Sequence, residues 1–431
     1  MGWMRKRPSS RAFERQSSVR RQLLTAGAMS LAGLGLAAVR KGRAAILEEN
    51  QRAAQPKTPV ARGAILVAGR PEEAGMSSPR LNRIADRLQT ETSSGRVTSA
   101  SILVARHGKI VLHRGFGKLH SGPGAPVTRP DTIYLLASIS KPVTVCALMR
   151  LVERGQVVLS DPVQRYLPEF QGDHKAQVKV WHLLSHISGM PDMVPNNVAL
   201  RRAHAPLSRF VEEALGTPLL YQPGTQFAYQ SMGTLLAAEI TERVSEMRLR
   251  DFLRREIFAP LQMQHTTLGL NGLAISETAI YQERNGDTND AKSWGPNSAY
   301  WRDMGHPWGG LHSTTGDLAR LLQTFQNGGR GGEFQLFSAG TGNAMTRDHN
   351  QRVGAPWGLG WALRDSPVWN YFGDLGSAST FGHVGVTGTV AWSDPSRRLI
   401  CVLLTTGGAS TRGRFLLNGI SNMVQSAVVA A

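Results

Sequence analysis

Two strand hairpins lie near opposite ends of this 431-residue chain, and mainly helical sequence separates them. The first covers residues 100–115 and turns at His107-Gly108, a dipeptide typical of a tight hairpin. The second covers residues 387–406. The order of elements is strands, then helices, then strands. One sheet that takes strands from both ends of the chain, with its apolar faces covered by helices, accounts for this order. We predict an α/β fold of the α+β type, with an antiparallel sheet flanked by helices and a mainly helical insertion.

Helical periodicity fills in the rest of the domain. Apolar residues recur at helical spacing in four segments, residues 79–92, 138–155, 316–327 and 412–429. The folded domain is expected over 72–431, after a lead-in over 46–71. Its sheet region covers about 72–160 and 300–431, and its helical region covers about 161–299.

The net charge of +18 suggests a nucleic-acid partner, but its distribution argues against one. Residues 1–45 hold ten basic side chains and one acidic side chain, so half of the excess lies in a segment that we expect to be removed. The sequence shows no zinc-finger spacing, aromatic RNA-binding signature or basic helix with heptads. We predict a solvated basic surface and no nucleic-acid partner.

Residues 1–45 have the pattern of an export signal. Arg20-Arg21 precede a Gly- and Ala-rich apolar run over 23–39, and basic and small residues follow it. Paired arginines before a weakly apolar run are typical of a cleaved twin-arginine signal. An uncleaved N-terminal membrane anchor is the alternative. We predict a periplasmic or cell-envelope protein that meets the membrane only during export.

A serine stands one helical turn before a lysine at the start of the helix predicted over 138–155. Of the nine lysines, only Lys141 has a serine, Ser138, three residues before it. Positions i and i+3 share a helix face, so the two side chains would meet. A hydroxyl needs a nearby base to act as a nucleophile, and a buried lysine can lose its proton near neutral pH. The pattern alone is weak, because a serine cap beside a solvated lysine is common. The apolar sequence on both sides buries the pair and favours the catalytic interpretation.

Two further motifs follow in order, Tyr229-Gln-Ser231 and His383-Val-Gly385. Together with the Ser-x-x-Lys pair they resemble the three active-site motifs of the serine β-lactamase and penicillin-binding-protein superfamily. The class C branch and its esterase and D-amino-acid peptidase relatives are the most similar. The resemblance runs from about residue 72 to the C-terminus and implies a β-lactamase/transpeptidase-like fold.

The resemblance also implies roles for individual residues. Ser138 is acylated, Lys141 accepts its proton or holds the base in its charge state, and Tyr229 shares the general-base role and protonates the leaving group. The backbone N–H groups of Ser138 and Val386 form the oxyanion hole. Substrate binding is implied for three residues: Ser231, His383 and Gly385.

Two positions depart from the β-lactamase pattern. Ser231 stands where many β-lactamases have an asparagine that holds a substrate carbonyl. His383 stands where many have a lysine that binds the β-lactam carboxylate, and imidazole is mostly neutral at pH 7. These changes predict weak β-lactamase activity without affecting acyl transfer. For His383, a direct substrate contact and a neutral hydrogen-bonding neighbour both stay open.

The cysteine and histidine patterns do not indicate a disulfide framework or a metal site. Cys146 and Cys401 lie in apolar stretches and are expected as buried free thiols. His182 and His186 have a spacing that can hold zinc, but no glutamate follows the first, so structural roles are expected. No Gly-x-Ser-x-Gly, dinucleotide-binding or phosphate-loop motif occurs. We expect no metal and no cofactor.

The sequence therefore predicts an exported serine hydrolase of the β-lactamase-related type. It would form an acyl-enzyme on Ser138 with a small-molecule or peptide acyl substrate, as an esterase or a D-amino-acid peptidase does. The alternative is a catalytically weak penicillin-binding-like protein that binds or transfers cell-wall peptides.

Overall fold

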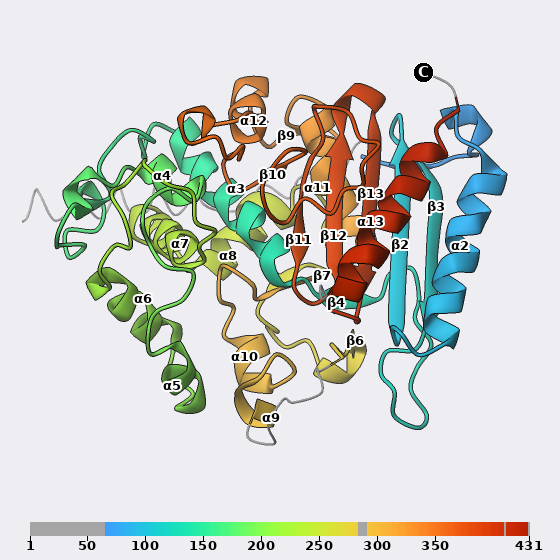
Figure 1. The fold of residues 1–431 in the computed structure, drawn as a ribbon, viewed down its shortest axis with the longest axis horizontal. Helices are drawn as coiled ribbons and strands as arrows, with labels where there is room; N and C mark the ends of the chain where they lie inside the picture. Colours follow the sequence, from blue (N-terminus) through green and yellow to red (C-terminus); the bar gives the residue numbers. More distant parts are fainter. Residues whose placement is uncertain (1–64, 283–290, 409–410, 430–431) are drawn as a thin grey trace, which may run out of the picture. The chain divides into compact units, whose positions relative to one another are not determined.

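The main sheet takes its strands from both ends of the chain (Figure 1). The computed structural model describes residues 65–282, 291–408 and 411–429, all within one compact unit, Val60–Ala431. The export segment and most of the lead-in lie outside the described residues. The sheet has seven strands in the order β1 (Val67–Ala68), β3 (Lys109–Gly117), β2 (Ser99–Arg106), β13 (Leu399–Thr405), β12 (Thr389–Asp394), β11 (Phe381–Gly385) and β10 (Ala362–Leu363).

Both predicted hairpins form, and they pair with each other. The turn between β2 and β3 has positive φ angles at His107 and Gly108, 53° and 75°, as a tight primed turn requires. Strand β13 pairs antiparallel with β2, from Leu399 opposite Arg106 to Thr405 opposite Ala100. The pair β1–β3 is parallel, and the other neighbours are antiparallel. This confirms the predicted sheet.

Helices cover both faces of the sheet because its central strands are apolar on both sides. Ile102 and Val104 of β2 share a core with α2 (Ser78–Ser93) and α13 (Thr411–Ser426). Leu103 and Ala105 point the other way, into a core shared with α3 (Ser140–Glu153) and α11 (Thr315–Gln326). Side chains alternate along a strand, so each strand contributes to both cores. The helices predicted over 79–92, 316–327 and 412–429 are confirmed as α2, α11 and α13.

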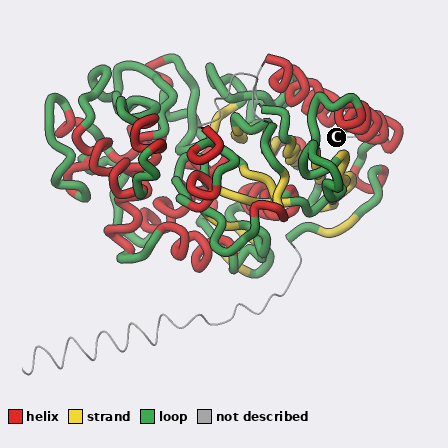
Figure 2. The backbone as a smooth tube through the Cα atoms, turned by 90° about the horizontal axis from the view of Figure 1, so that it is seen from below, coloured by secondary structure: helices red, strands yellow, loops and turns green. Residues whose placement is uncertain are grey.

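A helical region lies beside the sheet in Figure 2 and is built around α7 (Met232–Ser245), which packs on α3. The shorter helices α4 (Val180–Leu184), α6 (Leu207–Gly216) and α8 (Leu249–Leu253) pack on α7. The other short helices are α5 (Asn197–Arg202), α9 (Ala291–Trp294), α10 (Ala299–Asp303) and α12 (Ala339–Thr346). Within the described ranges, no helix has the length and apolar character needed to cross a bilayer.

Two small sheets were not predicted. A four-stranded sheet has the order β5 (Thr267–Leu268), β7 (Leu311–Ser313), β4 (Ile133–Leu135) and β6 (Thr278–Ala279). A two-stranded sheet joins β8 (Arg330–Gly331) to β9 (Phe334–Gln335). Such short strands carry too few residues for a periodic signal. The four-stranded sheet matters because β4 leads directly into Ser138.

The helix predicted over 138–155 begins later than expected. Residues Ala137–Ile139 form a 3-10 turn, and the α-helix α3 starts at Ser140. Helical periodicity does not distinguish a tight first turn from a regular one. The helix ends as predicted, because Gly155 follows it with a φ of 69°.

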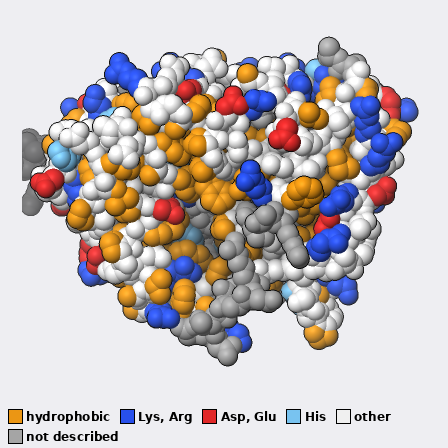
Figure 3. All heavy atoms as spheres, in the orientation of Figure 1, with side chains coloured by type: hydrophobic (Ala, Val, Ile, Leu, Met, Phe, Trp, Pro, Cys, Tyr) orange, Lys and Arg blue, Asp and Glu red, His pale blue; other side chains and the backbone are white. Residues whose placement is uncertain are grey.

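Two further expectations concern the cysteines in the core and the basic side chains on the surface. Cys146 and Cys401 are buried free thiols, as predicted. On the face drawn in Figure 3, Lys and Arg side chains lie scattered among acidic, polar and apolar ones rather than in one stripe. The absence of a nucleic-acid partner stays a prediction.

Candidate active site

A strained turn presents Ser138 between β4 and α3. Ala137 has a φ of 49°, in the left-handed region, which costs an alanine about 1 kcal/mol. Ser140 holds this bend: its hydroxyl donates to the Ala137 carbonyl at 2.7 Å and accepts from the Leu311 N–H of β7 at 2.9 Å. Ser138 itself is partly exposed. Ser140 lies between the two motif residues, and its role in holding this turn was not predicted from the sequence. The hydrogen bonds of its hydroxyl become visible only in the structure.

Lys141 lies against the Ser138 hydroxyl in an apolar environment. Its Nζ is 3.1 Å from Ser138 Oγ and 3.3 Å from the Trp308 carbonyl, and the side chain is 1% exposed. Burial lowers the pKa of Lys141 to about 7, although the negative charge of Asp192 acts in the opposite direction. A large fraction of the amine is therefore neutral at physiological pH. The structure thus brings together the serine and lysine that the sequence pairs.

Tyr229 is the third member of this group. Lys141 Nζ lies 4.6 Å from the centre of the Tyr229 ring. The Tyr229 hydroxyl is buried and makes no hydrogen bond of good geometry with any described residue. Burial raises the pKa of the Tyr229 hydroxyl well above its usual value, although the neighbouring Ser138 hydroxyl acts in the opposite direction. Tyr229 therefore keeps its proton in the resting site and would donate it only to a strong base such as a leaving alkoxide.

His186 packs against Tyr229, a contact that the sequence did not specify. Its Nδ1 accepts the Gln230 N–H at 3.3 Å, and its ring centre is 4.7 Å from that of Tyr229. The φ angle of His186 is 63°, so the backbone is strained to place this ring. Burial holds the pKa of His186 well below its usual value, so the ring is neutral. The structural role predicted for His186 agrees with these contacts.

The third motif is joined to the nucleophile turn by hydroxyl contacts. Thr387 Oγ1 donates to the Leu135 carbonyl at 2.8 Å, and Thr389 Oγ1 donates to the Leu136 carbonyl at 2.9 Å. A Cβ on Gly385 would lie 2.0 Å from the Leu136 carbonyl oxygen. Only glycine permits this approach. The close approach of β11 to Leu136 brings Val386, which is 43% exposed, near the turn that carries Ser138.

His383 lies in β11 near the Tyr229 ring and is fully buried. Its Nδ1 lies 2.8 Å from the Val384 carbonyl oxygen, so it is the protonated ring nitrogen. Burial lowers its pKa to about 3, and the ring centre is 6.0 Å from that of Tyr229. His383 is therefore neutral, as one of the two predicted alternatives requires. A direct substrate contact stays a prediction.

Ser231 and Asp192 form a polar pair next to Tyr229. Ser231 is 2% exposed, and its hydroxyl donates to Asp192 Oδ1 at 2.6 Å. The Ser231 N–H also donates to the Asp192 carbonyl at 3.2 Å. The hydroxyl proton of Ser231 is thus engaged within the protein, so a substrate contact through Ser231 stays a prediction. Asp192 itself is exposed.

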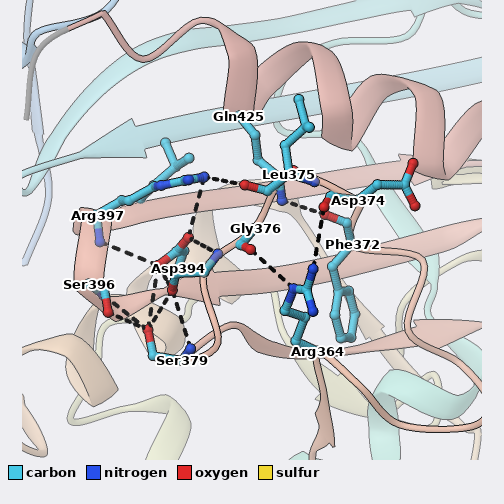
Figure 4. Close-up of polar contacts among 12 residues, drawn as sticks. Arg364, Phe372, Asp374, Leu375, Gly376, Ser379, Asp394, Ser396, Arg397 and Gln425 are labelled. Carbon is cyan, nitrogen blue, oxygen red and sulfur yellow. Dashed lines mark hydrogen bonds and ion pairs between the residues drawn. The ribbon is translucent and has the colours of Figure 1, made fainter.

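An aromatic loop borders Tyr229 on another side. Trp369, between β10 and β11, lies 5.5 Å from the Tyr229 ring centre. The loop is anchored around the buried Asp394 carboxylate (Figure 4). Asp394 accepts hydrogen bonds from the Ser377 hydroxyl at 2.6 Å and the Ser377 N–H at 3.0 Å. Gln425 of α13 donates to the Phe372 carbonyl at 2.6 Å. The loop that carries Trp369 is therefore fixed to the sheet and to α13.

A large cavity elsewhere lacks this chemistry. About 1010 Å³ in volume, it lies among α6, α7, α8 and α10 and is lined by Glu239, Arg250 and Tyr300, among others. Neither Ser138 nor Lys141 lines it. In the described part of the chain, no group of three acidic, histidine or cysteine side chains could hold a metal ion. The Ser138 centre is therefore the better candidate for catalysis.

A family model described as Beta-lactamase matches residues 81–419, which is more than three quarters of the chain. The protein belongs to the β-lactamase family. The match includes all three motifs, so this confirms the family that the motifs resemble. A protein of Salmonella agona (strain SL483) named "Putative D-alanyl-D-alanine carboxypeptidase" is 30% identical over 373 residues, 79% of this chain and 85% of that protein.

Solved structures confirm the β-lactamase family fold. A penicillin-binding protein homolog from Caulobacter crescentus has a TM-score of 0.67 at 23% identity, over 82% of this chain and 99% of that one. A family VIII carboxylesterase has a TM-score of 0.65 at 21% identity, over 80% of this chain and 98% of that one. This protein is thus a β-lactamase-family serine hydrolase, and its relatives carry both esterase and carboxypeptidase names.

Proposed function

We propose that the protein hydrolyses small esters through an acyl-enzyme on Ser138, in preference to β-lactams. The contact between Lys141 Nζ and Ser138 Oγ, 3.1 Å long and with Lys141 buried, carries the proposal. A nucleophile and a base within hydrogen-bond reach are the minimum that acyl transfer needs.

The steps follow from the protonation states. Neutral Lys141 takes the Ser138 proton as Oγ attacks the carbonyl carbon. The N–H groups of Ser138 and Val386 hold the oxyanion. As the bond to the leaving alkoxide breaks, Tyr229 gives it a proton and recovers one from Lys141. Water then attacks the acyl-enzyme, with the proton transfers reversed, and releases the acid.

The pH dependence of acylation tests the role of Lys141. For a neutral ester, kcat/KM should rise as the pH passes through about 7, because Lys141 must lose its proton first. Asp192→Asn should move this rise to lower pH, since the Asp192 charge raises the pKa of Lys141. Stopped-flow acylation from about pH 5.5 to 8.5, a range that spans the transition, measures both.

A second buried lysine provides the control for that profile. Lys175 is also buried, but it donates to the Leu215 carbonyl at 2.6 Å, away from Ser138. Lys175→Met can alter stability but should leave the pH of the rise unchanged. A wild-type rate that is flat across this pH range contradicts Lys141 as the base.

The preference for esters rests on position 383, where a neutral histidine stands in place of the lysine that binds the carboxylate in many β-lactamases. A β-lactam carries a carboxylate near its reactive carbonyl, but His383 is neutral, and Val384 offers no hydroxyl. In the described ranges, no arginine hydrogen-bonds to or stacks on Ser138, Lys141, Tyr229 or His383. Losing one charge-assisted hydrogen bond costs about 1.5–3 kcal/mol, roughly ten- to a hundredfold in binding.

The test compares kcat/KM for a short-chain p-nitrophenyl ester with that for a chromogenic cephalosporin. The kcat/KM for the ester should be roughly ten- to a hundredfold higher than that for the cephalosporin. Ser138→Ala supplies the background rate, and a fluorophosphonate label on Ser138 separates an enzyme from a silent binding protein. A faster reaction with the cephalosporin means that another cation binds its carboxylate.

The name of the Salmonella relative favours a second candidate, cleavage of peptides that end in D-alanyl-D-alanine. Such a peptide also ends in a carboxylate, so the same missing cation weighs against it. A D-alanyl-D-alanine peptide in the panel above, with and without an added amine acceptor, tests hydrolysis and transfer together.

We also propose that the protein is exported through a twin-arginine signal. The support is Arg20-Arg21 before the Gly- and Ala-rich run over residues 23–39. Replacing both arginines with lysine should retain the precursor in the cytoplasm. Envelope fractions with unchanged amounts of the double-lysine protein contradict the proposal.

A further inference from the structure

Asp192 is an exposed carboxylate held in place beside the catalytic group. Its Oδ1 accepts the Ser231 hydroxyl at 2.6 Å, and its carbonyl accepts the Ser231 N–H at 3.2 Å. Ser231 is 2% exposed and lies two residues after Tyr229, at the start of α7. An ordinary surface aspartate is free to rotate, whereas this one is tied to a buried residue at both its side chain and its backbone.

The carboxylate of Asp192 has no direct ion-pair partner among the residues that the structure describes, although many surface carboxylates of this chain do. His186 and His383 are held neutral by burial. Asp192 is hydrogen-bonded to Ser231, two residues after Tyr229, and in agreement with this position its charge raises the pKa of both Lys141 and Tyr229.

We propose that Asp192, held by Ser231, is a specificity-determining residue that binds a cationic group of the substrate, such as a primary or quaternary ammonium. The inference rests on the proposed function, because it requires an ester or amide that reacts at Ser138. A carboxylate with one oxygen engaged still has a second oxygen to offer a cation. The same negative charge disfavours substrates that carry their own carboxylate near the reacting carbonyl.

Matched pairs of esters with a fixed charge test the proposal. One pair carries the charge on the acyl side: the p-nitrophenyl ester of γ-trimethylammoniobutyrate and its tert-butyl isostere. The other pair carries it on the alcohol side: acetylcholine and its dimethylbutyl isostere. Quaternary ammonium does not titrate, so the ratio of kcat/KM within a pair reports charge alone. A variant that lowers kcat/KM by the same factor for both members of a pair leaves this ratio unchanged.

The wild-type protein should prefer the cationic member of at least one pair by roughly fivefold, since Asp192 is exposed to solvent. Asp192→Asn should bring that ratio to about one. Added sodium chloride should shrink the wild-type preference, because salt screens an exposed pair. Asp131→Asn is the matched control: Asp131 is an exposed aspartate paired with Arg129, and its loss should leave the ratio unchanged.

Three outcomes distinguish the two hypotheses. A wild-type ratio near one in both pairs, with neutral esters still hydrolysed through Ser138, overturns the inference and leaves the proposed function standing. A preference that survives Asp192→Asn also overturns the inference. Failure to hydrolyse any ester of either pair overturns the proposed function, and the inference falls with it.

Discussion

Ser138→Ala should lower the rate of acyl-enzyme formation by at least about four orders of magnitude, the largest effect expected for this protein. The variant lacks the atom that forms the covalent bond. Lys141→Ala should lower the rate by roughly three orders of magnitude, since it removes the base 3.1 Å from Ser138 Oγ. Intact-protein mass after reaction with a fluorophosphonate measures acylation directly.

The two substitutions act on one step, so the double variant should be no slower than Ser138→Ala alone. Lys175→Met controls for the loss of a buried lysine, because Lys175 lies away from Ser138 and donates to Leu215. A Ser138→Ala protein that is still labelled and keeps wild-type turnover identifies a different nucleophile. Additive losses in the double variant contradict a shared step.

Gly385→Ala should lower kcat/KM by roughly two to three orders of magnitude, as the loss of one oxyanion donor does. The new Cβ would lie 2.0 Å from the Leu136 carbonyl oxygen and 2.3 Å from Thr389 Oγ1. The Leu136 carbonyl belongs to the backbone and cannot rotate away as a flexible side chain can. The end of β11 must therefore move. That movement displaces Val386 relative to Ser138. Steady-state hydrolysis of a p-nitrophenyl ester measures the loss.

Gly419→Ala provides the matched control. Gly419 lies in α13, and a Cβ there would meet nothing within 4 Å. Alanine should keep full activity at this position and stabilise the helix by about 0.5–1 kcal/mol. Thermal melting separates misfolding of Gly385→Ala from a local displacement. A folded Gly385→Ala protein with wild-type kcat/KM contradicts the oxyanion role of Val386.

Local spacing was enough to predict several parts of the molecule. The two strand segments on either side of the dipeptide His107-Gly108 predicted the first hairpin, and the structure forms it. The serine three residues before Lys141 predicted their contact, and the two atoms lie 3.1 Å apart. Both predictions succeed because the period of a strand or helix turn is a property of a few neighbouring residues.

The same reasoning failed where a local detail depends on distant packing. The predicted helix start at Ser138 is wrong by two residues, because the left-handed Ala137 and its hydrogen bond from Ser140 replace the first turn. The Ser140 hydroxyl is fixed in turn by Leu311, more than 160 residues away. No pattern in the residues around Ser138 contains that contact.

The sequence by itself therefore determined the two-ended sheet, the helices on it, and the three motifs that carry the family. Only the tertiary structure decided what surrounds the motifs: the burial that lowers the pKa of Lys141 to about 7, the His186 contact behind Tyr229, and the Asp192 charge beside Ser231. Each of these joins segments that are far apart along the chain. Their distances depend on how whole elements pack, and desolvation depends on every neighbour at once.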